Sequence, residues 1–117
     1  MNLETFRTYC ISMKGVTEEL PFGPETLVYK VMGKMFALTS LNDFTGFNIK
    51  VVPETGAELR ERYAEIKEAY HMNKKHWITV NPTGSISDKL MKTMIEESYG
   101  LVVGGLTKKL KLELDGL

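Results

Sequence analysis

The sequence predicts an α+β domain in which helices cover one face of an antiparallel sheet. Segments rich in β-branched and aromatic residues follow one another with connections too short for parallel crossovers. Segments with apolar residues at spacings of three and four precede, separate and follow these strands. The expected order is α-β-β-β-α-β-α, and a single sheet with its helices on one side is the simplest arrangement that buries every apolar stripe.

The composition is typical of one globular domain, which we expect to span residues 1–117. Of its 117 residues, 43% are apolar and 26% are charged, as in ordinary domains with a single core. Cys10 is the one cysteine and cannot form an internal disulfide. The N-terminus lacks a signal-peptide pattern, and no segment has the ~20 apolar residues of a membrane span. We therefore expect a cytoplasmic protein that does not associate with membranes.

The first predicted element is a helix over residues 2–14. Its apolar residues lie on one face, Asn2 is a suitable cap, and Gly15 is a suitable stop. The proline and glycine content of residues 20–25 then predicts a loop.

Three strands are expected next, at residues 26–31, 36–41 and 47–51. Gly33 can adopt the positive φ that a tight two-residue turn requires, so the first two strands should form a hairpin. The third alternates apolar and polar residues, which indicates one buried and one solvated face.

The second half of the chain is predicted to contain two more helices and one more strand. Pro53 suits the first turn of a helix of about ten residues. Residues 67–75 match neither period and are expected to form a loop, and residues 76–80 form the fourth strand. The longest helix should cover 87–103, starting at its first or second residue, because it has a wide apolar stripe.

Five segments together resemble the MmcQ/YjbR family. In chain order they are Pro21-Phe22-Gly23, Lys30 to Ala37, Lys50 to Glu54, Tyr70 to Val80, and Ser98-Tyr99 followed by Leu101-Val102-Val103. The resemblance covers nearly the whole chain and implies a CyaY-like or "double wing" α+β fold. It also implies DNA binding, which is inferred for this family mainly from fold similarity. One departure is Glu68-Ala69, where relatives tend to carry Pro-Gly or Pro-Ala, so the following loop is expected to be less rigid.

The segment from Tyr70 to Val80 contains the main candidates for nucleic-acid contact. It has two lysines, two histidines, two aromatic residues and no acid. Lys74 and Lys75 suit phosphate contact as point charges, and Asn73 and His76 can donate hydrogen bonds. The alternative is that the two lysines belong to an ordinary solvated loop.

Lys30 and Lys34 are further candidates, because a hairpin inserted into a groove would bring them to DNA. The favoured alternative for both is protection of an edge strand against aggregation. Trp77 is expected to be a core residue instead of a platform for stacking a base. Alternation places Trp77 and Thr79 on the same strand face but leaves open which face is buried.

The net charge of zero weighs against a dedicated nucleic-acid binder, which usually has an excess of Lys and Arg. The first hypothesis is nevertheless weak, largely sequence-independent binding of double-stranded DNA. The alternative is a non-enzymatic module that binds a protein partner through an exposed sheet face. A ligand binder or enzyme with a pocket around Tyr70, His71 and Trp77 is the least favoured. The sequence does not indicate an oligomeric state.

No motif indicates catalysis, and we expect neither an enzyme nor a cofactor. The sequence contains no nucleophile elbow and no glycine-rich phosphate loop. His71 and His76 are five residues apart without a cysteine pair or acidic cluster, so no metal site is expected. Cys10 lies on an apolar stripe and should be buried and inert. Lys108 and Lys109 are expected to be solvated residues beyond the last helix.

Overall fold

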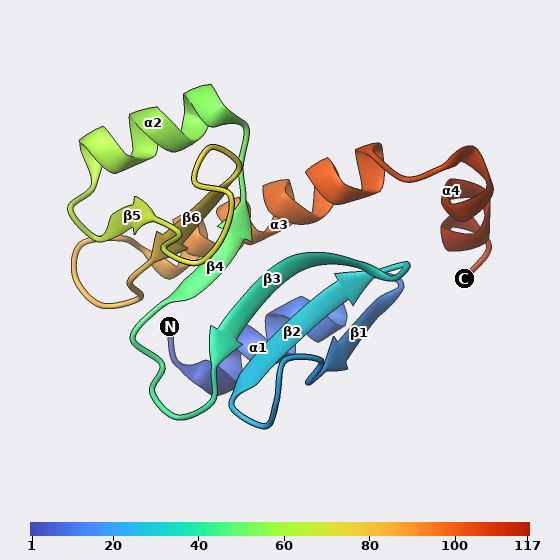
Figure 1. Ribbon diagram of the computed structural model, residues 1–117, viewed down its shortest axis with the longest axis horizontal. Coiled ribbons are helices and arrows are strands. Elements are labelled where there is room, and N and C mark those ends of the chain that lie inside the picture. Colours follow the sequence, from blue (N-terminus) through green and yellow to red (C-terminus); the bar gives the residue numbers. More distant parts are fainter.

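The computed structural model describes all 117 residues and confirms an α+β fold with an antiparallel sheet (Figure 1). The elements in chain order are α1 (Leu3–Ser12), β1 (Val16–Glu19), β2 (Thr26–Val31), β3 (Lys34–Ser40), β4 (Phe47–Lys50), α2 (Pro53–Arg62), β5 (Ile66–Glu68), β6 (Trp77–Val80), α3 (Asp88–Gly104) and α4 (Lys108–Asp115). The strands form one sheet in the order β1-β2-β3-β4-β6-β5, and every neighbouring pair is antiparallel. None of the helices combines the length and the hydropathy needed to cross a bilayer.

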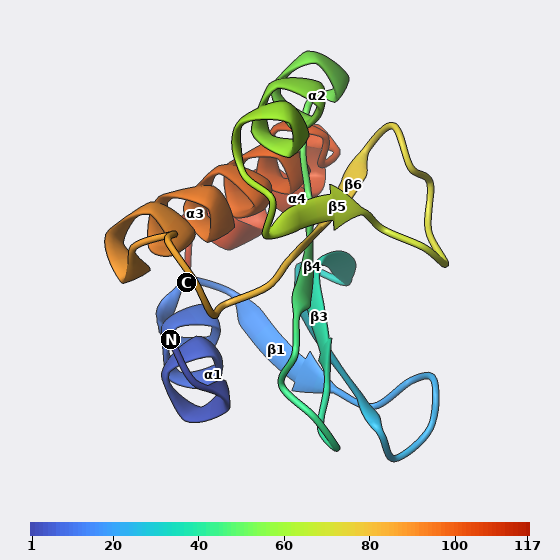
Figure 2. The same cartoon turned by 90° about the vertical axis from the view of Figure 1, so that its left-hand side faces the viewer.

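The helices lie on one side of the sheet (Figure 2). The row of paired residues Tyr29, Ala37, Ile49 and Ile78 points to that side and belongs to the core. Side chains alternate along a strand, so the residues between them point to the other side. We call this other side the open face. Its strand residues are Thr17, Glu19, Thr26, Val28, Lys30, Met35, Leu38, Ser40, Asn48, Lys50, Lys67, Trp77 and Thr79.

Helix α1 packs an aromatic side chain into the centre of the core. The ring centroid of Phe6 lies 5.6 Å from that of Tyr29 and 4.7 Å from that of Phe47. Asn2 is the cap that the sequence predicts, since its side chain accepts a hydrogen bond of 2.8 Å from the Thr5 backbone. The helix is shorter than expected, because extended backbone follows Ser12 and Gly15, at φ 75°, turns the chain into β1.

The predicted hairpin between β2 and β3 is confirmed. Val31 pairs with Lys34, and the two residues between them, Met32 and Gly33, have φ values of 50° and 81°. Positive φ at both positions matches the twist of the flanking strands. Both strands are interior in the sheet, because β1 pairs along β2. Edge protection is therefore the wrong interpretation of Lys30, which is paired on both sides, whereas Lys34 lies in the part of β3 that β4 does not reach.

Three short elements were not expected from the sequence: β1, β5 and α4. The strands have one apolar residue each, Val16 in β1 and Ile66 in β5, so no alternation is visible in either. Strand β5 also corrects the predicted loop 67–75, which begins only after Glu68. Helix α4 is short and lysine-rich, and Leu114 holds it to the core.

A buried serine joins α3 to the sheet where β3 and β4 separate (Figure 1). Ser98 is fully buried. Its hydroxyl donates a hydrogen bond of 2.6 Å to the carbonyl oxygen of Phe36 and accepts one of 2.8 Å from the backbone N–H of Lys50. The serine thus replaces a direct strand-to-strand hydrogen bond and fixes the opening between the two strands.

Candidate nucleic-acid interface

The antiparallel register brings several lysines to one end of the sheet. Strand β2 ends there and β3 begins there, which places Lys30 and Lys34 around their turn. Strand β4 ends at the same end with Lys50, whose partner Trp77 begins β6. The loop over residues 69–76 enters β6 at this point. We call this surface the basic end, and its lysines are Lys30, Lys34, Lys50, Lys74 and Lys75.

Most of these lysines have no carboxylate partner. The structure has three ion pairs, and among the basic-end lysines only Lys30 takes part, with 3.2 Å between its Nζ and Oε1 of Glu19. Hydrogen bonds from Thr17 and then from Lys30 lower the pKa of Glu19. The remaining four form no ion pair, namely Lys34, Lys50, Lys74 and Lys75, although Lys50 lines a hollow that Glu97 of α3 also lines.

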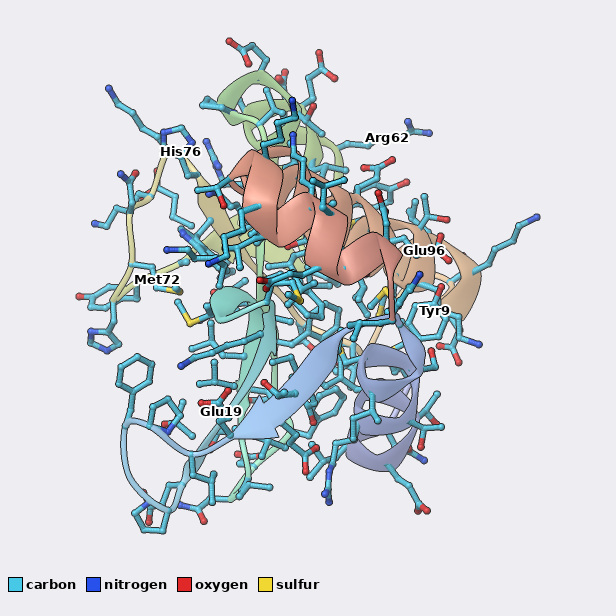
Figure 3. All side chains as sticks on the ribbon, turned by 90° about the vertical axis from the view of Figure 1, so that its right-hand side faces the viewer. Tyr9, Glu19, Arg62, Met72, His76 and Glu96 are labelled. Carbon is cyan, nitrogen blue, oxygen red and sulfur yellow. The ribbon has the colours of Figure 1, made fainter.

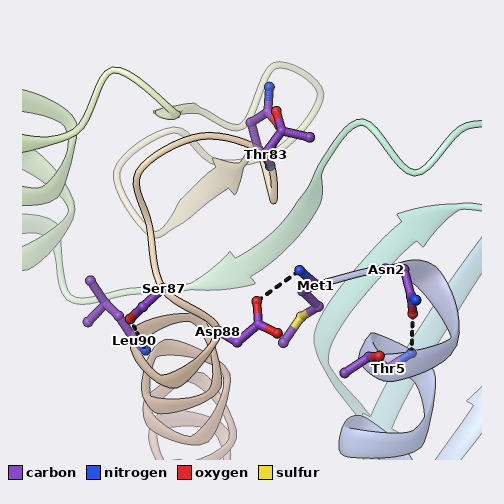
Figure 4. Close-up of polar contacts among 8 residues, drawn as sticks. Met1, Asn2, Thr5, Thr83, Ser87, Asp88 and Leu90 are labelled. Carbon is purple, nitrogen blue, oxygen red and sulfur yellow. Dashed lines mark hydrogen bonds and ion pairs between the residues drawn. The ribbon is translucent and has the colours of Figure 1, made fainter.

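The other two ion pairs lie on the helix side. Arg7 of α1 donates two hydrogen bonds to the carboxylate of Glu18, at 3.0 and 2.8 Å. The N-terminal ammonium lies 2.8 Å from Asp88, beside the cap of α3 (Figure 4). Neither of these two ion pairs involves a lysine of the basic end.

Two consecutive turns shape the loop that contains Lys74 and Lys75. The N–H of Met72 donates to the carbonyl of Ala69 at 3.3 Å, and the N–H of His76 donates to the carbonyl of Asn73 at 3.1 Å. The Asn73 side chain accepts a hydrogen bond of 3.0 Å from the Lys75 backbone. Figure 3 shows Met72 and His76 on the side of the molecule opposite Tyr9 and Glu96. The loop thus presents its polar side chains away from the helices.

The sequence-predicted contacts Asn73, Lys74, Lys75 and His76 lie together in this loop, and all four are exposed. The Nζ of Lys74 sits 5.6 Å from the ring centroid of Tyr70, which is itself 81% exposed. An exposed ammonium over a ring remains accessible to a phosphate.

Trp77 is buried, as the sequence predicts, with 9% of its surface exposed. The structure also decides which strand face it occupies: Trp77 and Thr79 point to the open face, while Ile78 and Val80 join the core. The predicted pocket around Tyr70, His71 and Trp77 does not form, because Tyr70 and Trp77 line none of the hollows in the surface.

A groove of about 520 Å³ lies on the open face between the β1–β2 loop (residues 20–25) and the loop 69–76. Figure 2 shows both loops on the side of the sheet away from the helices. The groove is lined by Phe22, Thr26, Leu38, Thr39, Ser40, Gly46, Asn48, His71 and Met72. Its lining contains aromatic, aliphatic and hydrogen-bonding groups but no carboxylate.

Sequence reasoning missed Lys50 and the groove residues Phe22 and Asn48 as members of a site. The register of β4 was needed to place Lys50 beside the first hairpin. Phe22 did carry a signal, since it is a large aromatic residue in a loop of prolines and glycine, where no core demands it.

The thiol and the metal-ligating side chains do not form a site beside this surface. The structure contains no group of three His, Cys, Asp or Glu side chains that converge as metal ligands. Burial raises the pKa of the Cys10 thiol, and the side chain is fully enclosed in the core. The open face itself presents ammonium groups, amides, hydroxyls and aromatic rings.

The fold defines the class of this protein, an α+β domain with helices on one face of an antiparallel sheet. Comparison with known proteins identifies its family. The family model described as YjbR matches residues 11–101, and the chain belongs to the YjbR family. It is 41% identical to the uncharacterized protein YbdF of Escherichia coli O157:H7, over 91% of this chain and 88% of the relative. It is 24% identical to the uncharacterized protein YjbR of Escherichia coli K12, over 93% of both chains.

Two solved structures share the fold. A crystal structure of the Deinococcus radiodurans protein DR2400, described with a DUF419 domain, aligns with a TM-score of 0.90 and 36% identity. That alignment covers 97% of this chain and 88% of the other. A crystal structure of a Pseudomonas syringae protein aligns with a TM-score of 0.74 and 29% identity, over 86% of this chain and 98% of the other. The names of these relatives and structures assign no activity.

Proposed function

We propose that this protein binds DNA through the basic end. The observation that supports the proposal is the gathering of Lys34, Lys50, Lys74 and Lys75 at one end of the sheet, without ion-pair partners. Phosphate neutralisation by lysine provides most of the affinity in non-specific binding. A surface of this kind attracts a phosphate backbone even though the chain as a whole is neutral.

The lysines of the basic end favour contact with DNA phosphates over recognition of the base sequence. Lysine binds phosphate as a point charge, whereas bidentate recognition of guanine depends largely on the fork of an arginine. The arginines of this chain lie in α1 and α2 and not on the open face, at Arg7, Arg60 and Arg62. Binding is therefore weak and largely independent of sequence.

A salt titration with duplex DNA tests the proposal. If the four unpaired lysines each neutralise one phosphate, the logarithm of the binding constant falls with that of the salt concentration at a slope of about −3.6. Reversing the two loop charges in Lys74→Glu/Lys75→Glu removes two contacts, so the slope should decrease to about −1.8. Fluorescence anisotropy measures both slopes.

The matched control is Lys108→Glu/Lys109→Glu, which makes the same charge change on exposed residues of α4. Because both variants alter the net charge equally, a general electrostatic effect would weaken them alike. The proposal requires the loop variant to lose more affinity than the α4 variant. Equal losses, or an unmeasurable affinity of the unmodified protein at low salt, contradict it.

A second candidate function is binding of a protein partner by the same face. Large apolar side chains are exposed on the two loops, with Leu20 at 49%, Phe22 at 66% and Tyr70 at 81%. Such side chains often anchor protein interfaces. A pull-down from nuclease-treated lysate separates the two functions: a stoichiometric partner lost in Phe22→Ala but kept in Lys74→Glu/Lys75→Glu supports this one.

A further inference from the structure

The geometry points to a seat for an unpaired nucleobase in the groove between the two loops, which would make single-stranded DNA a ligand of the open face. The inference rests on the proposed function, because phosphates held by the basic end bring the base to the groove. The groove measures about 520 Å³. That volume is within the range of about 300–1,000 Å³ typical of small-ligand sites and exceeds that of one base.

Phe22 provides the stacking surface. Its side chain lines the groove from the β1–β2 loop and remains 66% exposed, although aromatic rings of its size are usually buried. Base stacking on an aromatic ring is tolerant of sequence, because every base has a π-face. An exposed ring at the mouth of a groove is suited to cover one face of a base.

The floor of the groove offers hydrogen bonds to a base edge. The Oδ1 of Asn48 accepts a hydrogen bond of 2.6 Å from the Thr79 hydroxyl, which leaves the amide nitrogen as the donor group. Its nearest acceptor is the sulfur of Met72 at 3.6 Å, and a thioether sulfur accepts only weakly. Thr26 and Ser40 add hydroxyls to the same floor. These groups can meet donors and acceptors on the edge of an unstacked base.

The charges around the groove favour a nucleic acid over other occupants with aromatic rings. No carboxylate lines the groove, and His71 and Met72 of its wall belong to the same loop as Lys74 and Lys75. The groove lies where β2 begins and β3 ends, and the loop 69–76 connects it to the basic end at the other end of these strands. A strand with one base in the groove would thus place neighbouring phosphates along this loop, near Lys74 and Lys75. A base in a duplex is stacked and paired and cannot enter without being extruded, so an unpaired strand is the preferred ligand.

The test compares oligothymidine with an abasic strand of equal length at one salt concentration. Both present the same phosphates, so their affinity ratio reports contacts to bases. We expect oligothymidine to bind at least about 5-fold more tightly, the lower end of what one stacked base contributes. Phe22→Ala should bring the ratio close to one, and Phe22→Trp should restore it. Lys74→Glu/Lys75→Glu should weaken both strands by the same factor.

Tyr70→Ala is the matched control, because Tyr70 is an exposed aromatic residue of the facing loop that lines no hollow. It should leave the ratio unchanged. Equal binding of the two strands, or equal effects of Phe22→Ala and Tyr70→Ala, overturns the inference and leaves the proposed function intact if duplex DNA still shows the expected salt slope. Failure of every strand and duplex to bind at low salt overturns both. Circular dichroism verifies that each variant is folded.

Discussion

Ser98→Ala should destabilise the protein strongly, although it removes a single oxygen atom. The hydroxyl of Ser98 bridges the carbonyl of Phe36 and the N–H of Lys50, and the side chain is fully buried. Alanine leaves both backbone groups without a partner in a place that water does not reach. The opening between β3 and β4, which sets the position of Lys50 at the basic end, depends on this bridge.

The size of the effect follows from the two groups that lose their partner. An unsatisfied buried polar group costs about 1–3 kcal/mol, so the pair costs about 2–6 kcal/mol. Alanine is a better helix former than serine by roughly 0.5 kcal/mol, which offsets a small part of the loss. We therefore expect the free energy of unfolding to decrease by about 2–5 kcal/mol. For a chain of this length, each kcal/mol lowers Tm by about 4 °C.

Urea denaturation followed by circular dichroism measures the change, and Thr93→Ala is the control. Thr93 lies on the same helix and is exposed, and its hydroxyl donates a hydrogen bond of 3.1 Å to the carbonyl of Lys89. Its replacement gains similar helix propensity without exposing a buried group, so it should change stability by less than about 0.5 kcal/mol. A Ser98→Ala variant within that margin of Thr93→Ala would refute the reasoning. Faster amide exchange at Lys50 should accompany the loss of stability.

Two further predictions concern titratable groups. Hydrogen bonding to Arg7 lowers the pKa of Glu18 below its usual 4.5 in the folded protein. The charged carboxylate therefore stabilises the fold above pH 4.5, and this contribution is lost as pH falls through the lowered pKa. The Tm difference between the unmodified protein and Glu18→Gln should accordingly shrink on acidification in thermal melts, and a difference independent of pH would contradict this. Cys10 is fully buried, and burial raises the pKa of its thiol. It should resist a thiol-specific reagent such as DTNB in the native state and react promptly in denaturant, whereas rapid native labelling would show an open core.

Local signals in the sequence were sufficient for the main elements of the fold. The cap at Asn2, the tight turn at Gly33 and the apolar stripe of α3 each depend on residues close together in the chain. All seven expected elements are present in the expected order. Helix capping, turn chemistry and periodicity are local effects, and this is why they are visible without a structure.

The missed strands depend on partners that are distant in sequence. Strand β1 has two glutamates among its four residues, and its Glu18 accepts hydrogen bonds from Arg7 and from the hydroxyl of Tyr29. Strand β5 is three residues long and is stabilised by its pairing with β6. Neither has a pattern of its own, because the neighbouring strand and side chains provide the stabilising contacts.

The candidate site could be predicted as residue types but not as a surface. Alternation along a strand shows which residues share a face but not which of the two faces is buried. Packing against α1 and α3 decides which becomes the open face. Trp77 illustrates this, since its burial was predicted and its face was not. Phe22 and Asn48 come from different parts of the chain, so the groove between the loops exists only in the folded protein.

A net charge of zero is compatible with DNA binding because, at moderate salt, a phosphate responds mainly to the charges within about one Debye length of it. Most acidic residues lie in the helices, at Glu4, Glu54, Glu58, Glu61, Asp88, Glu96, Glu97, Glu113 and Asp115. The helix layer adds about 10 Å between them and the open face, which is about one Debye length at 0.1 M salt. A phosphate at the basic end is thus largely screened from those carboxylates. At 0.01 M salt the Debye length of about 30 Å approaches the size of the molecule, 39 × 32 × 26 Å, so the charges of the helices then act on the same phosphate. The helices also contain eight basic residues, namely Arg7, Arg60, Arg62, Lys89, Lys92, Lys108, Lys109 and Lys111, which nearly cancel these nine acids. The salt plot should consequently stay close to linear down to this concentration, and a strong bend would contradict the reasoning.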